Sequence, residues 1–169
     1  MKVSVLKSIL PTVLSAVIAT AFTQACSVGS SLVSAQTTET ADPIEGLWSS
    51  QVTVTNCQTG AVMRSFAALN LFARGGTVID TDSQPPTGHG PGFGVWTDKG
   101  AAQYTSSFQF YRFNTDGSLA GSQQIARTIT LAAGGQSFTS DLNVSILDTN
   151  GNSIGSACGT ETATKAPQS

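Results

Sequence analysis

The strongest constraint in this sequence is an alternation, with a period of two residues, between apolar side chains and hydroxyl or other polar side chains. In the seventh such stretch, Phe138, Leu142, Val144 and Ile146 share one parity, whereas the opposite positions carry mostly Ser, Thr, Asp and Asn. Similar stretches recur after about residue 44, and none of them shows a convincing repeat of 3.6 residues. Because successive side chains of a strand point to opposite faces, this pattern predicts antiparallel strands with one buried and one wet face.

Turn signals divide the same region into eight runs. Several are dipeptides that supply the positive φ angle of a tight hairpin turn. No helix is available to connect parallel strands, so neighbouring runs should pair as an antiparallel meander. Closure of the meander removes its two unpaired edges. We therefore predict an all-β fold with a single eight-stranded antiparallel up-and-down β-barrel, and a two-sheet sandwich is the alternative. The turn signals are Thr59-Gly60, Gly75-Gly76, Gln84 to Gly92, Lys99-Gly100, Asp116-Gly117, Gly134-Gly135 and Asn150-Gly151.

The first 35 residues have the character of an export signal. Lys2 and Lys7 precede a mostly apolar stretch that is too short and too rich in Ser and Thr for a membrane anchor. Cleavage is expected after Ala35 or, as a rival site, after Ala25. We predict a secreted or periplasmic protein, and acylation of Cys26 as a lipid anchor is the minor alternative. The predicted organisation is a signal peptide at 1–35, a flexible tether at 36–43, a barrel domain at 44–163 and a disordered tail at 164–169.

The charge of the chain argues against two classes of partner. Charged residues make up 11% of the sequence, and the formal net charge is −2. Without a cluster of Lys or Arg, binding to nucleic acid or to an anionic membrane is not expected. We also expect no transmembrane segment in the mature chain, and the sequence leaves the oligomeric state open.

Removal of the signal would leave two cysteines, Cys57 and Cys158. In an oxidising compartment such a pair predicts a disulfide. In an up-and-down barrel the first and last strands are neighbours, so the bridge would join the two strands at the seam. Cys57 has the solvent-side parity of its strand. Cys158 shares the parity of the apolar Ile154, which indicates the buried face of its strand. We expect a bulge or the shear of the barrel to absorb this mismatch.

The start of the first strand resembles a known family. Gly46-Leu47-Trp48, at the head of an eight-stranded meander, looks like the Gly-x-Trp signature of lipocalins and their calycin relatives. The resemblance implies that Trp48 closes one end of the barrel and that an arginine, here Arg127, packs over it. Longer strings such as Asn56-Cys57-Gln58-Thr59-Gly60 resemble those of small secreted bacterial β-barrel proteins of uncharacterised function, over about residues 44 to 163.

Aromatic residues are concentrated in the first five runs. A small eight-stranded barrel either fills its interior with side chains or keeps a cavity for one small ligand. Small residues such as Gly94 and Ser106 would leave room for such a cavity. The residues predicted to line it are Trp48, Phe66, Phe93, Trp96, Tyr104, Phe108, Phe110 and Arg127.

Other chemically suggestive residues are interpreted as ordinary surface features. His89 is the only histidine, and no orienting partner for it is evident in the sequence, so we expect an exposed loop residue at the mouth of the barrel. Asp80 and Asp82 share one face of the third run and are expected to be neighbours on an exposed strand. No catalytic residue, metal ligand or cofactor is predicted.

Three functions remain open at this point. The first is a non-catalytic binding module for a small apolar or aromatic ligand. The second is an envelope or extracellular protein-interaction domain with a filled core, which would use the Gly/Pro-rich segment 84–92. The third is an enzyme of the barrel isomerase or cyclase type, with polar groups around Arg64, Tyr104 and Arg127. A closed pocket of roughly 300 Å³ or more would favour the first over the second.

Overall fold

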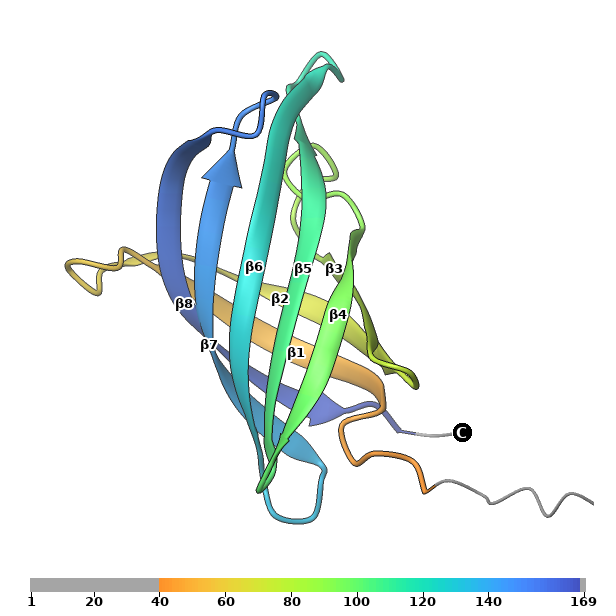
Figure 1. Cartoon of the computed structure of the whole chain (residues 1–169). Helices are drawn as coiled ribbons and strands as arrows, with labels where there is room; N and C mark the ends of the chain where they lie inside the picture. The colour runs from red at the N-terminus through yellow and green to blue at the C-terminus, as the bar shows by residue number, and fades with distance from the viewer. Residues whose placement is uncertain (1–39, 168–169) are drawn as a thin grey trace, which may run out of the picture. The chain divides into compact units, whose positions relative to one another are not determined.

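A computed structural model describes residues 40–167 and shows an all-β barrel (Figure 1). Eight antiparallel strands pair in sequence order, and the last strand pairs with the first, so the barrel is closed. The predicted barrel is therefore confirmed, and the two-sheet sandwich is excluded. The predicted signal peptide and the first half of the tether, residues 36–39, lie outside the described residues. The strands are β1 (Gly46–Thr55), β2 (Val62–Ala73), β3 (Thr77–Asp82), β4 (Gly92–Gly100), β5 (Gln103–Phe113), β6 (Leu119–Leu131), β7 (Ser137–Leu147) and β8 (Ser153–Lys165).

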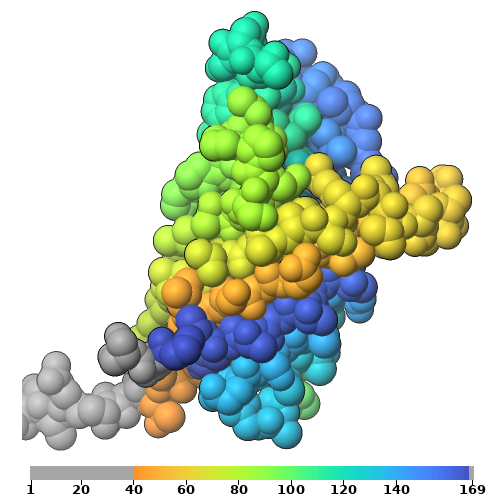
Figure 2. All heavy atoms as spheres, turned by 180° about the vertical axis from the view of Figure 1, so that it is seen from behind, coloured from red at the N-terminus to blue at the C-terminus, as the bar shows by residue number. Residues whose placement is uncertain are grey.

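The pairing of β1 with β8 closes the barrel and extends it beyond its expected end. Thr164 and Lys165, which were predicted to belong to a disordered tail, pair with Ser49 and Trp48. The sheet therefore continues two residues past the predicted boundary at residue 163. At its other end β1 runs into the β1–β2 hairpin, which projects from the barrel wall (Figures 1 and 2).

The predicted disulfide between Cys57 and Cys158 is confirmed, with a Cα–Cα distance of 4.9 Å. The expected parity mismatch does not arise. Ile154 is 60% exposed, so the parity that it shares with Cys158 is the outward one, as is that of Cys57. The shear of the barrel sets the end of β1 opposite the middle of β8, where Thr55 pairs with Cys158.

Large aromatic side chains fill the end of the barrel where β1 and β7 begin. We call Trp48, Phe72, Trp96, Tyr104 and Phe138 the aromatic plug. Trp48 is fully buried, and its ring centroid lies 4.9 Å from that of Phe138. The indole nitrogens of Trp48 and Trp96 each donate a hydrogen bond to a backbone carbonyl, at 2.8 and 2.9 Å. The plug therefore combines apolar packing with satisfied polar atoms, as buried indoles require.

The cation over Trp48 is not the predicted one. The Nζ atom of Lys165 lies 5.2 Å from the centroid of the Trp48 ring and donates to the carbonyl of Pro43 at 2.7 Å. Arg127 instead stacks over Phe108, at 4.4 Å, in the middle of the barrel. The expectation that Arg127 covers Trp48 is therefore wrong, because its guanidinium instead contacts Phe108 and the carboxylates of Asp80 and Glu161.

Tyr104 joins the aromatic plug to the segment that precedes β1. Its hydroxyl donates to Oδ1 of Asp42 at 2.8 Å, so part of the predicted tether is held against the barrel. Burial raises the pKa of Tyr104, and the hydrogen bond to Asp42 raises it further.

The raised pKa of Tyr104 predicts a loss of stability in alkaline solution. A tyrosine in the unfolded chain titrates near pH 10. The folded state holds this proton more tightly, so the free energy of unfolding falls as the pH rises above about 10. Tyr104→Phe should make this fall shallower and should cost about 1 kcal/mol at neutral pH, where the hydrogen bond is lost. Urea unfolding curves at neutral pH and at a pH above about 10 measure both effects. Tyr111→Phe, which removes an exposed hydroxyl, is the control, and an equal alkaline fall in Tyr104→Phe and the unmodified chain would contradict the expectation.

Candidate functional site

A hollow occupies the other half of the barrel interior, at the end that carries the β5–β6 and β7–β8 turns. We call it the chamber. Its cavity measures about 40 Å³, and with the solvent-open mouth the hollow reaches about 480 Å³. A cavity of this size has room for a few water molecules or for one small chemical group. Most of its wall is apolar and comes from Val52, Val54, Phe66, Ala68, Phe108, Phe110, Ile125, Leu142 and Val144, whereas Arg64, Gln84 and Gln123 add polar groups.

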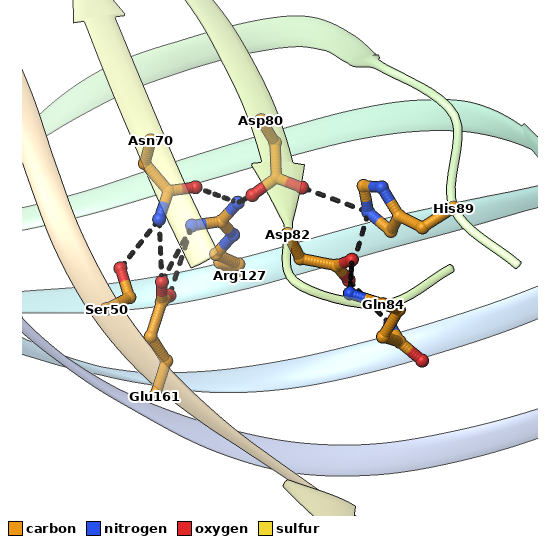
Figure 3. A network of polar contacts seen from close by, with 8 residues as sticks. All are labelled: Ser50, Asn70, Asp80, Asp82, Gln84, His89, Arg127 and Glu161. Atoms are coloured by element: carbon orange, nitrogen blue, oxygen red, sulfur yellow. Dashed lines mark hydrogen bonds and ion pairs between the residues drawn. The ribbon is translucent and has the colours of Figure 1, made fainter. Parts of the chain in front are cut away.

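A layer of buried polar side chains lies between the chamber and the aromatic plug, and Arg127 is its centre (Figure 3). Its Nη2 donates to Oδ1 of Asn70 at 2.8 Å and to Oδ2 of Asp80 at 3.1 Å. Its Nη1 donates to both carboxylate oxygens of Glu161, at 3.3 and 3.1 Å. Arg127 of β6 thus reaches across the interior to β2, β3 and β8. We call Asn70, Asp80, Arg127 and Glu161 the charged layer.

The carboxylate of Glu161 is fully engaged, although it is only 2% exposed. Besides Arg127, it accepts hydrogen bonds from Asn70 Nδ2 at 2.9 Å and from Ser140 Oγ at 2.9 Å. Asn70 Nδ2 also donates to Ser50 Oγ at 2.7 Å. Buried charges require partners of this kind, because an uncompensated charge in a protein interior is strongly destabilising.

His89 adds an imidazole beside the charged layer. Its Nε2 lies 3.1 Å from Oδ1 of Asp80 and 3.7 Å from Oδ2 of Asp82, and its ring stacks on Phe110 with centroids 3.7 Å apart. The segment between β3 and β4 is folded back over the barrel, where Gly90 N donates to the carbonyl of Tyr111 at 3.0 Å. This anchorage turns His89 inward, so that its side chain is 4% exposed and contributes to the chamber wall.

Two glycines of β4 make room for the aromatic ring that supports Arg127. A Cβ atom at Gly92 would lie 2.8 Å from the ring of Phe108, and one at Gly94 would collide with the backbone of Ser107 and Phe108. The ring of Phe108 therefore lies against these glycines, and the Arg127 guanidinium stacks on it. The space that Gly94 was predicted to leave empty is thus filled by Phe108.

The structure divides the predicted cavity residues among three places. Phe66, Phe108, Phe110 and Arg127 line the chamber. Trp48, Trp96 and Tyr104 belong to the aromatic plug, on the far side of the charged layer. The side chain of Phe93 lies on the outer face of β4 and is 61% exposed, because the flanking Gly92 and Gly94 hold the inward positions.

Sequence reasoning missed most of the charged layer. The interpretation of Asp80 and Asp82 as exposed neighbours is wrong, since their side chains are 6% and 1% exposed, and His89 is buried rather than exposed at the mouth. The positions of Asp80 and Glu161 in the strand alternation indicated that their side chains point inward. Asp80 shares the parity of Val78, which is fully buried, and Glu161 shares that of Ala157 and Ala163.

The arrangement is suited to holding a polar group at the inner end of an apolar space. Within residues 40–167, no three side chains from His, Cys, Asp and Glu are arranged to hold a metal ion. Over the same residues there is no helix with the length and apolar character needed to cross a membrane. Two side chains that line the chamber, His89 and Arg127, each have a buried nitrogen, Nδ1 and Nε respectively, without a partner.

No protein-family model matches the sequence, and no curated protein matches it. The geometry of the chamber and its charged layer is therefore the basis on which a function can be proposed.

Proposed function

We propose that this chain is an exported, non-catalytic binding protein whose chamber holds a small molecule with a short apolar body. The observation that carries the proposal is the position of the charged layer at the inner end of an apolar chamber with an open mouth. An apolar wall with a few convergent polar groups is the usual composition of a small-molecule site. The disulfide supports the exported location, because such bonds persist in oxidising compartments.

The volume of the chamber limits the ligand. A cavity of about 40 Å³ is much smaller than the sites of about 300 Å³ or more that enclose drug-sized molecules. The ligand therefore has few atoms inside the barrel, and the rest of its apolar body lies in the mouth. Arg64 is exposed there, so its side chain is free to move as a ligand enters.

The second candidate is a protein-interaction domain, and it draws support from the outer face rather than from the segment between β3 and β4. In that segment His89 is turned inward, away from any partner. Outside the barrel, Leu47, Leu71, Ile79 and Phe93 are direct neighbours across β1 to β4. Three of them are 39–61% exposed, and exposed apolar rows of this kind are a common feature of contact surfaces.

A substitution that fills the chamber tests the binding proposal. Val54 lines the chamber, and Gln51 of the same strand is exposed on the outer face. Val54→Phe should weaken the binding of 1-butanol at least about tenfold, because the added ring occupies the cavity, whereas Gln51→Phe should leave it unchanged. Amide chemical shifts in an NMR titration measure the affinity and locate the binding. Shifts spread over the outer surface, or equal affinity in both variants, would contradict the proposal.

A further inference from the structure

The buried acidic groups beside the chamber outnumber the buried basic ones. Asp80, Asp82 and Glu161 bring three buried carboxylates, and these face one guanidinium, that of Arg127, and the imidazole of His89. The guanidinium already donates to Asn70, Asp80 and Glu161. Asp80 and Glu161 therefore compensate the positive charge of Arg127. The remaining local excess of negative charge favours a cationic ligand over an anionic one.

His89 leaves one polar atom of the chamber wall without a partner. Its Nε2 faces the carboxylates of Asp80 and Asp82, at 3.1 and 3.7 Å. Its Nδ1 is buried and has no hydrogen-bond partner among the described residues. A buried polar atom of this kind favours a ligand with a polar head over a purely apolar one.

The aromatic part of the wall is also compatible with a positive charge. Phe108 and Phe110 line the chamber, and their ring centroids are 6.4 Å apart. The negative faces of aromatic rings attract ammonium groups. Arg64 acts in the opposite direction, but it lies at the exposed mouth, with its guanidinium 5.7 Å from the ring centroid of Phe66, where solvent screens its charge.

We propose that the ligand of the chamber is a primary amine on a short apolar chain, bound as its ammonium ion. The ammonium group donates to the carboxylate of Asp80, beside the buried charge of Glu161, and the chain extends between the apolar walls toward the mouth. An ammonium head is close to the size of a water molecule and suits a cavity of about 40 Å³. This inference depends on the proposed binding function and adds the chemical class of the ligand.

Three butyl compounds of equal length test this assignment in the disulfide-bonded full chain. Butylamine, 1-butanol and butyrate carry a cationic, a neutral and an anionic head, and NMR titrations near pH 7 give the affinity of each. We expect butylamine to bind in the chamber at least about tenfold more tightly than 1-butanol, and butyrate to bind most weakly. Equal or tighter binding of 1-butanol or butyrate in the chamber would overturn the amine assignment but leave the binding function intact. If none of the three shifts the chamber resonances, both proposals are overturned.

A matched pair of variants tests whether the buried charge is responsible. Glu161→Gln keeps the shape of the side chain and removes one buried carboxylate, whereas Asp141→Asn removes an exposed one from the outer face of β7. Glu161→Gln should weaken butylamine binding about tenfold and leave 1-butanol binding unchanged, and Asp141→Asn should change neither. Equal loss for butylamine and 1-butanol in Glu161→Gln would mean that the residue only shapes the chamber, and would overturn the assignment. If Glu161→Gln does not fold, the comparison of the three compounds in the unmodified chain decides the question.

Discussion

Replacing Arg127 by methionine is expected to lower the free energy of unfolding by about 3–5 kcal/mol, which is the usual loss when one member of a buried ion pair is removed. Methionine keeps the length of the side chain but leaves the carboxylates of Asp80 and Glu161 buried without their cation. Urea unfolding measures the loss, and fluorescence of the two buried tryptophans in the aromatic plug follows the transition.

Two further variants show whether this loss comes from charge. Arg74 forms an ion pair with Glu45 at 3.4 Å, but its side chain is 58% exposed, so Arg74→Met should cost less than about 1 kcal/mol. Combining Arg127→Met with Glu161→Gln should cost clearly less than the sum of the two single changes, because the second change removes a charge that the first one strands. Strict additivity would show that Arg127 stabilises the barrel by packing alone.

Removal of the disulfide by replacing both Cys57 and Cys158 with serine is expected to lower the free energy of unfolding by about 2–5 kcal/mol. The bridge joins residues 101 positions apart in the sequence, so it restricts the unfolded chain strongly. The barrel itself should still form, since β1 and β8 also pair through their backbones. Urea unfolding of the double variant and of the chemically reduced native chain should give the same loss.

Hydrogen exchange adds a test of where the bridge acts. The largest increase in amide exchange should occur at the end of β1 and in the middle of β8, next to the removed bond. A loss of stability below about 1 kcal/mol, or increased exchange confined to other strands, would contradict a stabilising role at the seam.

The strands and their closure were predictable because they depend on local patterns. Alternation identifies each strand from its own residues, and glycine-containing turns mark where each hairpin reverses, as at Gly134-Gly135. Closure then follows from the number of strands and the short turns. The disulfide was also predictable. The outward parity of Cys158 was not, because Ile154, which shares it, is apolar but lies exposed at the bulge that begins β8.

The charged layer was not predictable in the same way, because its members lie on four strands. Each of them is stable in the interior only when the others are present to bind it. Asn70, Asp80 and Glu161 each look like an ordinary polar residue in its own strand, and Arg127 looked like a cover for Trp48. Their compensation depends on the diameter of the closed barrel, which brings β6 within hydrogen-bonding distance of β2, β3 and β8. His89 was missed because its burial depends on how its loop is anchored on β5.

The aromatic plug makes the interior a dead end. A molecule bound in the chamber as proposed would meet Arg127 and, beyond it, the packed rings of Trp48 and Phe138, so it would enter and leave by the same mouth. Its residence time would then be set by the rearrangement of a few side chains at the rim, such as Arg64 and Gln84, without separation of the strands.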